Sequence, residues 1–226
     1  MSTEAHMLEA SRRLAQALVP GDLDKTLERI TAAAVEVLPE VDYASITVKH
    51  PDGRLDTAAP TDEMLLQLDA AQYGLREGPC YQSAVDSVHI TAPFLAHDER
   101  FPRYGPIAVA AGVNAQAGLQ LFDAPGGDGA LNLYATRAGA FEDLAALGQL
   151  FAHQSAMALS YARQISQLHE AVETRQLIGR AVGVVMERYE LDEARAFGFL
   201  ARVSQDNNVK LREVAARLLE ETGKTR

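Results

Sequence analysis

The chain has 226 residues, of which 47% are hydrophobic and 23% charged, and its net charge is −10. This composition is typical of a chain with a folded core and excludes a largely disordered one. No apolar run approaches the roughly 20 residues that a membrane-spanning helix needs. The N-terminal MSTEAHMLEA lacks the pattern of a secretory signal, and the only cysteine cannot form an internal disulfide, so a cytoplasmic location is expected.

The negative charge is distributed unevenly along the chain. Residues 1–162 carry 10 basic and 21 acidic side chains, whereas residues 163–226 carry 11 basic and 10 acidic ones. The overall negative charge disfavours a nucleic-acid partner for the chain as a whole, but the C-terminal segment permits one. Mixed charges of this kind are equally typical of a solvated helical surface.

The first part of the chain predicts helices at both ends of a run of strands. A helix is expected over 22–38, with Asp22 as its N-cap and Pro39 as its stop, because Leu23, Leu27, Ile30, Ala34, Val37 and Leu38 share one face. Strands are expected at 43–50 and 55–60 around the turn PDGR. Thr61 is the expected cap of a further helix over 62–72.

The next segment predicts a short helix, a strand and a hairpin. Gly78 and Pro79 interrupt the chain before a short helix, which a strand near Val88–Thr91 follows. After a loop and helix in RFPRYGPIAVAAGV, the segments NAQAGLQLF and ALNLYAT flank the glycine-rich DAPGGDG as a hairpin. The element order predicts an α+β fold, an antiparallel sheet with flanking helices.

This part of the chain resembles a GAF domain over roughly residues 20–160. The resemblance is carried by EGPC before the short helix, by the hairpin GLQLFDAPGGDGALNLYA, and by AFEDLAALGQLFAHQSAMAL as the closing helix. GAF domains are small-molecule sensor and dimerisation modules, so the resemblance implies a sensory role, an unidentified small-molecule signal and no set cofactor. A ligand pocket would lie between the sheet and its helices. Its candidate residues, which equally suit a packed core, are Tyr43, Cys80, Tyr81, His89, Phe94 and Tyr104.

Catalytic and metal-binding chemistry find little support in the sequence. Nothing beside Cys80 would stabilise a thiolate, so a buried structural cysteine is expected. The six histidines show no pair at metal-ligand spacing. Neither a nucleophile–base set nor a metal cluster occurs, so a non-enzymatic protein without a bound metal is predicted.

A long helix is predicted from Phe141 onward, since Gly and Pro are absent between Gln149 and Ile178. Residues 141–160 either pack on the sheet of their own domain or continue a helical seam, whereas 160–175 predicts a parallel dimeric coiled coil, and hence a homodimer. With Leu144 as heptad position a, the a positions are Leu144, Phe151, Ala158, Ile165 and Val172, and the d positions are Leu147, Gln154, Tyr161, Leu168 and Arg175.

Three short helices are predicted after residue 175, in TRQLIGRAVGVVMERY, LDEARAFGFLARVS and NVKLREVAARLLEE. Asp192 is the expected N-cap of the second helix, and Phe197 is expected to be buried in it. Glycines inside the first two helices indicate close helix packing or close approach of a ligand.

These helices resemble an ANTAR domain, the RNA-binding output module of certain bacterial antitermination regulators. One position departs from the family, which commonly has a lysine where this chain has Val182. The residues that carry the resemblance are Arg175, Ile178, Ala181, Gly183, Met186, Glu193, Ala196, Phe197, Leu200, Ser204, Asn208, Lys210, Leu211, Val214 and Ala215.

The resemblance implies an RNA-binding surface around the turn SQDNNVK between the second and third helices. Amides and hydroxyls can read looped-out bases, and Arg and Lys can hold phosphate. The turn contains no aromatic residue, so base stacking is not expected there. Ser204 and Asn208 equally suit helix caps. The candidate RNA-binding residues are Arg180, Arg188, Arg202, Ser204, Asn208, Lys210 and Arg212.

Taken together, the chain resembles GAF- and ANTAR-containing regulators of the actinobacterial type. The expected parts are a GAF-like sensor at 1–160, a coiled-coil connector at 161–175 and an all-α, three-helix ANTAR-like module at 176–226. ANTAR relatives bind paired stem-loops in nascent leader RNA, so antitermination by a homodimer without a membrane partner is implied. Two alternatives remain, a DNA-binding transcriptional regulator and a dimeric scaffold that binds signalling partners.

Overall fold

The computed structural model describes residue 12 and residues 23–38, 40–86, 88–124, 127–142 and 144–223. The chain forms two compact units, Met1–Arg163 and Gln164–Arg226, which are called the first and second units below. Among the described residues, no helix combines the length and apolarity needed to cross a membrane.

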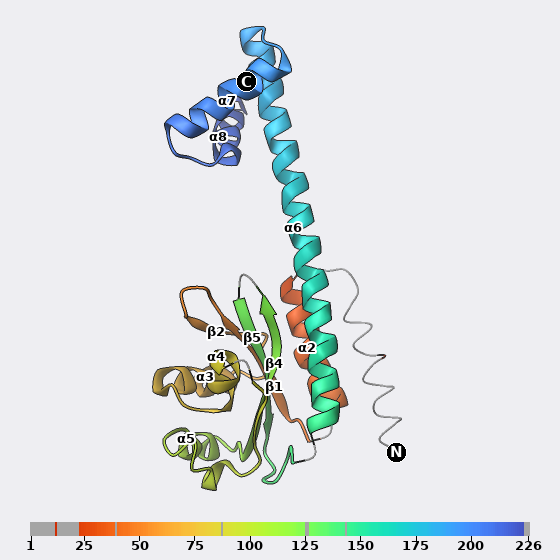
Figure 1. Cartoon of the computed structure of the whole chain (residues 1–226), viewed down its shortest axis with the longest axis vertical. Coiled ribbons are helices and arrows are strands. Elements are labelled where there is room, and N and C mark those ends of the chain that lie inside the picture. Colours follow the sequence, from red (N-terminus) through yellow and green to blue (C-terminus); the bar gives the residue numbers. More distant parts are fainter. Residues whose placement is uncertain are drawn as a thin grey trace. The chain divides into compact units, whose positions relative to one another are not determined.

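A five-stranded antiparallel sheet lies at the centre of the first unit (Figure 1). Its order is β2-β1-β5-β4-β3, so the predicted hairpin of β4 and β5 is completed by β1, which comes about 80 residues earlier in the chain than β5. The antiparallel sheet predicted from the sequence is therefore confirmed. The strands are β1 (Tyr43–Lys49), β2 (Leu55–Ala58), β3 (Ile90–Ala92), β4 (Ala115–Ala124) and β5 (Gly127–Ala135).

One face of the sheet is covered by α2 (Leu23–Val37) and by the beginning of α6 (Ala145–Tyr189). Ile46 of β1 and Ile30 of α2 are fully buried in this core, and Phe151 of α6 is 1% exposed. The beginning of α6 therefore packs on the sheet of its own unit, which settles the alternative left open for residues 141–160. The predicted cap and stop of α2, Asp22 and Pro39, lie outside the described residues.

The opposite face is covered by α3 (Met64–Leu75), α4 (Pro79–Asp86) and α5 (Tyr104–Ala110), with a short 3₁₀ turn at Leu95–His97. Thr61, the predicted cap of α3, does not serve that helix. Its Oγ1 accepts a hydrogen bond of 2.9 Å from the Ala44 N–H, while Asp62 Oδ1 accepts one of 2.9 Å from the Met64 N–H. Thr61 therefore ties its loop to β1, and the helix begins later than expected.

The second unit consists of the end of α6 with α7 (Glu193–Asp206) and α8 (Leu211–Gly223). The predicted connector and the first predicted short helix are parts of one continuous helix, because Gly179 and Gly183 do not interrupt α6. Asp192 is the N-cap of α7, as predicted, and its Oδ1 accepts a hydrogen bond of 2.8 Å from the Arg195 N–H. Among the described residues, the buried core of this unit is small and consists of Ala181, Val182, Val185, Ala196, Leu200 and Ala215.

The prediction that Phe197 is buried is wrong, since the side chain is 46% exposed. Ala196 and Leu200, one helical turn apart, face the core of the second unit. Phe197 lies about 100° further around the helix than Ala196. It therefore projects beside the core rather than into it.

Candidate nucleic-acid interface

The turn between α7 and α8 is held by its own polar groups. Ser204 Oγ donates a hydrogen bond of 2.6 Å to the Val209 carbonyl, and the Val209 N–H donates one of 3.0 Å to the Ser204 carbonyl. Asn208 has a positive φ of 50°, a left-handed conformation that Asn tolerates better than most residues. Ser204 and Asn208 are thus accounted for by the shape of the turn, and only the Asn208 side chain is exposed.

Two cations lie at the end of this turn. Lys210 is exposed, and Arg212 donates a hydrogen bond of 2.7 Å to Glu170 of α6. Both partners of that ion pair are exposed, so the pair contributes little to stability and is weakened by salt. The pair lies between the first turn of α8 and α6. The structure therefore brings Ser204, Asn208, Lys210 and Arg212 together.

The other three candidate arginines lie apart from the turn. Arg188 donates a hydrogen bond of 3.4 Å to Thr222, ten residues beyond Arg212 along α8, which corresponds to about 15 Å of helix. Arg180 and Arg202 are exposed on α6 and α7. These arginines extend the positive charge over the second unit without adding to the turn itself.

Exposed aromatic side chains that were not predicted from the sequence occur on α7 and at the end of α6. Phe197 is 46% exposed, and Phe199 and Tyr189 are 45% and 54% exposed. The rings of Tyr189 and Phe199 pack against each other, with their centroids 5.8 Å apart. A sequence signal for this was present, because residues two apart on a helix cannot both face the same core.

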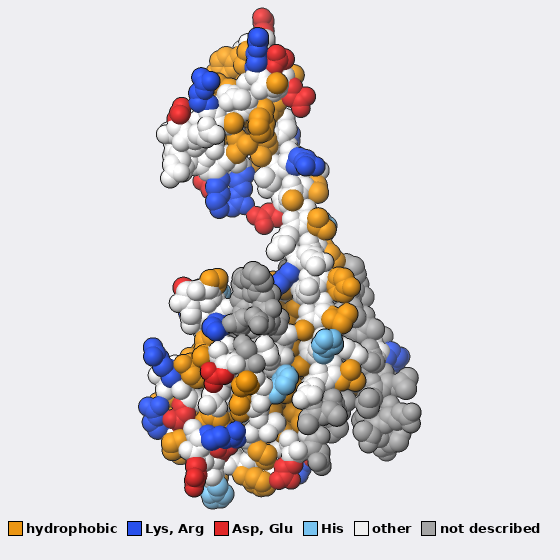
Figure 2. Space-filling view, in the orientation of Figure 1, with side chains coloured by type: hydrophobic (Ala, Val, Ile, Leu, Met, Phe, Trp, Pro, Cys, Tyr) orange, Lys and Arg blue, Asp and Glu red, His pale blue; other side chains and the backbone are white. Residues whose placement is uncertain are grey.

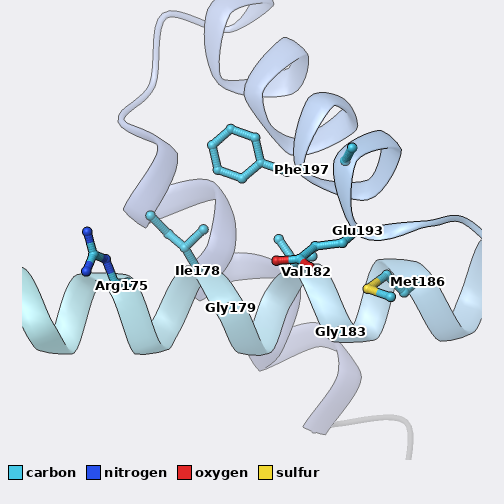
Figure 3. Close-up of a pocket in the computed structure, with 9 residues that line it drawn as sticks. Arg175, Ile178, Gly179, Val182, Gly183, Met186, Glu193 and Phe197 are labelled. Carbon is cyan, nitrogen blue, oxygen red and sulfur yellow. The ribbon is translucent and has the colours of Figure 1, made fainter.

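A groove of about 680 Å³ lies between α6 and α7 in the second unit. Figure 3 shows the Phe197 ring above Ile178 and the Glu193 side chain reaching toward Val182. Figure 2 shows apolar side chains gathered on the visible face of this unit, with charged side chains around them. The groove is lined by Arg175, Ile178, Gly179, Val182, Gly183, Met186, Glu193, Ala194 and Phe197.

In the first unit, the space expected for a GAF ligand holds a buried hydrogen-bonded cluster around Asp69. Asp69 accepts hydrogen bonds from the Ser45 hydroxyl at 2.9 Å, from the Thr57 hydroxyl at 3.0 Å and from Tyr134. Asn132 Nδ2 donates to Ser45 at 3.0 Å, while the buried Asn132 Oδ1 has no hydrogen-bond partner among the described residues. Polar side chains from three strands and α3 therefore meet below the sheet.

The candidate pocket residues of the first unit divide into two groups. Cys80 and Tyr104 are fully buried beside the Asp69 cluster, and Tyr43 packs against the same core. Tyr81 is half-buried, Phe94 is 48% exposed, and His89 lies at β3, where its Nδ1 accepts a hydrogen bond from the Gln120 N–H. Burial, followed by the negative charge of Asp69, raises the pKa of the Cys80 thiol well above its usual value.

The pKa of Asp69 predicts how the stability of the first unit varies with pH. Burial raises this pKa from 3.8 to about 6, although the Tyr134, Ser45 and Thr57 hydroxyls oppose the shift. Because the folded state holds the proton more tightly than the unfolded state, stability should fall as pH rises from about 4 to about 6. The expected loss from this group is about 3 kcal/mol. Urea unfolding of the full chain at several pH values measures it.

The matched control for this pH dependence is Asp69→Asn, which keeps the shape of the side chain but does not titrate. The free energy of unfolding of the variant should vary less steeply with pH between pH 4 and 6, and the difference in slope should correspond to at most one bound proton. Equal slopes for the two proteins would contradict the assignment to Asp69.

Comparison with known proteins bears on both units. Residues 166–219 match the ANTAR domain model. The fold of the first unit is similar to two solved GAF domains of phosphoenolpyruvate-protein phosphotransferases. One is from Coxiella burnetii (18% identity, 74% of this chain and 99% of that chain, TM-score 0.53), and the other is from Acinetobacter (16%, 74% and 99%, TM-score 0.51). This fold is also similar to that of an N-acylhomoserine-lactone-dependent LuxR-family transcription factor from Burkholderia cenocepacia (12%, 72% and 99%, TM-score 0.56). A search of the curated proteins finds no match.

The fold of the first unit therefore defines a GAF-like module, the class of fold found in sensor domains. The chain combines this module with an ANTAR domain at residues 166–219. Among the described residues, no group of three His, Cys, Asp or Glu side chains is arranged to hold a metal ion.

Proposed function

We propose that the protein is an RNA-binding transcription antitermination regulator that binds stem-loops in nascent leader RNA. The observation that carries this proposal is the ANTAR match at residues 166–219, on a folded three-helix unit whose α7–α8 turn displays Asn208, Lys210 and Arg212. Exposed cations at a turn suit phosphate contacts, and an exposed amide suits hydrogen bonds to an unpaired base. The bound RNA would compete with the formation of a terminator hairpin.

The proposed active form is a homodimer joined through α6. Three apolar heptad positions of α6 after residue 160 are exposed, Tyr161 by 55%, Leu168 by 65% and Val172 by 54%, whereas Ile165 is half-buried. Large apolar side chains at the d positions (Tyr161 and Leu168) and at the a position Val172 suit a parallel two-stranded coiled coil. A dimer would present two second units to one paired RNA target, which raises the effective concentration of the second contact.

The proposed division of the chain assigns residues 1–160 to the sensor, 161–175 to the coiled-coil connector and 176–226 to RNA binding. The GAF-like fold supports the sensor assignment, and the buried Asp69 cluster is a polar core that a small-molecule signal would have to enter or rearrange. Since α6 belongs to both the sensor fold and the RNA-binding unit, we propose that the signal acts through the pairing of this helix.

Binding of RNA by Lys210 can be tested with the full chain. A pool of tandem stem-loop RNAs with randomised loops would first be selected on the protein, and the selected RNA would then be bound over a range of salt concentrations. Lys210→Glu should weaken binding about 10-fold and lower the salt slope by roughly one, because a phosphate contact is lost. Filter binding or fluorescence anisotropy measures both quantities.

The matched control is Lys25→Glu, which makes the same charge change at an exposed position of α2. This variant should bind the selected RNA as the unchanged protein does. Failure to enrich any RNA would contradict the proposed function, and displacement of the RNA by duplex DNA at equal concentration would favour a DNA-binding regulator. Equal weakening by the two variants would mean that Lys210 makes no specific contact.

A further inference from the structure

We propose that the groove between α6 and α7 binds an unpaired base of the RNA, with guanine preferred. This inference rests on the proposed function and adds a second recognition site to it, away from the α7–α8 turn. The groove combines an open floor, an exposed aromatic wall and two unengaged charged side chains, Arg175 and Glu193. These are the components that single-stranded RNA recognition uses.

The floor of the groove is open because two helical glycines lie in it. A Cβ added to Gly179 or Gly183 would meet no atom within 4 Å in the part of the chain that the structure describes, so neither glycine is required for packing there. Glycine inside a helix is unfavourable relative to alanine. The sequence left two explanations for these helical glycines, close helix packing and close approach of a ligand. Close helix packing within one chain is therefore excluded, and close approach of a ligand remains.

The wall of the groove is formed by α7, with the exposed ring of Phe197 above the side chain of Ile178 (Figure 3). A flat, weakly polar surface of this kind suits a base that stacks on the ring while its other face lies over aliphatic side chains. Val182 contributes an apolar side chain to the floor of the groove. The groove of this chain therefore suits a base rather than a phosphate at this point.

The two charged side chains provide the polar contacts. Among the described residues, no hydrogen bond or ion pair engages Arg175 or Glu193. A carboxylate only accepts hydrogen bonds, and the Watson–Crick edge of guanine offers two adjacent N–H donors to its two oxygens. Arg175 lies one turn before Gly179 on α6 and would hold a neighbouring phosphate. Together these contacts favour guanine over uracil and adenine.

A second copy of α6 is a less suitable occupant of the groove. If the heptads of the proposed coiled coil are continued past Val172, the next d position is Arg175 and the next a position is Gly179. A charged residue and a residue without a side chain both weaken an apolar seam. The following d residue, Val182, is only 6% exposed, because it already belongs to the core of the second unit. The seam therefore ends where the groove begins.

The decisive experiment fills the groove without disturbing the fold. Gly183→Leu places a side chain in the open floor and raises helix propensity, so the chain should fold normally while its affinity for the selected stem-loop RNA falls about 10- to 100-fold. Phe197→Ala should cause a similar loss. The controls are Gly74→Leu, an exposed helical glycine in α3 with no atom within 4 Å of its added Cβ, and Phe199→Ala, an equally exposed ring outside the groove. Both controls should bind normally.

Two further measurements identify what the groove holds. 2-Aminopurine placed at each loop position in turn should report stacking at one position, and the signal should vanish in Phe197→Ala but not in Phe199→Ala. Inosine in place of guanine there should weaken binding to the unchanged protein but not to Glu193→Gln. If the unchanged protein binds RNA and Gly183→Leu binds equally well, the groove assignment is wrong and the proposed function stands. If Gly183→Leu changes only the dimer dissociation constant, the groove belongs to a second copy.

Discussion

A protein with lysine in place of Leu168 and Val172 should be monomeric and should bind a tandem stem-loop RNA at least about 100-fold more weakly than the unchanged chain. Both side chains are more than half exposed in the single chain, at 65% and 54%, so their replacement costs the monomer little. Two charges in each helix of the proposed seam would repel those of the partner helix. Sedimentation velocity measures the oligomeric state, and gel shifts measure affinity.

Binding to a single stem-loop separates loss of pairing from loss of recognition. The seam variant should bind one isolated stem-loop as the unchanged chain does, because each second unit keeps its own surface. The control is Ser166→Lys with Gln167→Lys, which adds the same charge at exposed positions outside the a and d rows. This control should remain dimeric. A dimeric seam variant, or one that loses affinity for the single stem-loop, would contradict the proposed coiled coil.

Leu200→Ala should unfold most of α7 and α8 at room temperature. Leu200 is 1% exposed in a core of six buried residues among those described, five of which are Ala or Val. Removing a buried leucine side chain costs about 2–5 kcal/mol, while a core this small rarely supplies more than about 3–5 kcal/mol. Far-UV circular dichroism should show the loss of helices of 14 and 13 residues, and RNA binding should be lost with them.

The control for this substitution is Leu66→Ala, the same chemical change at a leucine of α3 that is 47% exposed. Its helix content and RNA affinity should remain those of the unchanged chain. If Leu200→Ala kept its full helix content and melted at the same temperature, the buried cluster would not be what holds the second unit together.

Elements that depend on neighbouring residues were predicted well from the sequence. The alternation in YASITVK predicted a strand, which the structure shows as β1, with Ala44 and Ile46 buried in the core on one face of the sheet. Asp192 was recognised as a cap because its contact, to the Arg195 N–H, lies three residues away. Such signals are contained in short windows and need no knowledge of the tertiary fold.

Contacts between distant residues were missed for the corresponding reason. The partners of Asp69 lie 12, 24 and 65 residues away, at Thr57, Ser45 and Tyr134, and nothing in the local pattern around Asp69 indicates them. Phe197 was wrongly predicted to be buried because the apolar residues of AFGFL can form two different helical faces. Only packing against α6 and α8 selects the face that contains Ala196 and Leu200. The groove beside Phe197 could not be predicted for the same reason.

Because Cys80 is completely buried, the reactivity of its thiol reports local opening of the first unit. Cys80 is the only cysteine, it is fully buried, and burial keeps its thiol protonated at neutral pH. A thiol-reactive dye can therefore reach it only when the packing around α4 opens, so the labelling rate counts those openings. A signal molecule that stabilises or destabilises this part of the protein would be detected by slower or faster labelling, even if the chemical identity of the molecule is not known.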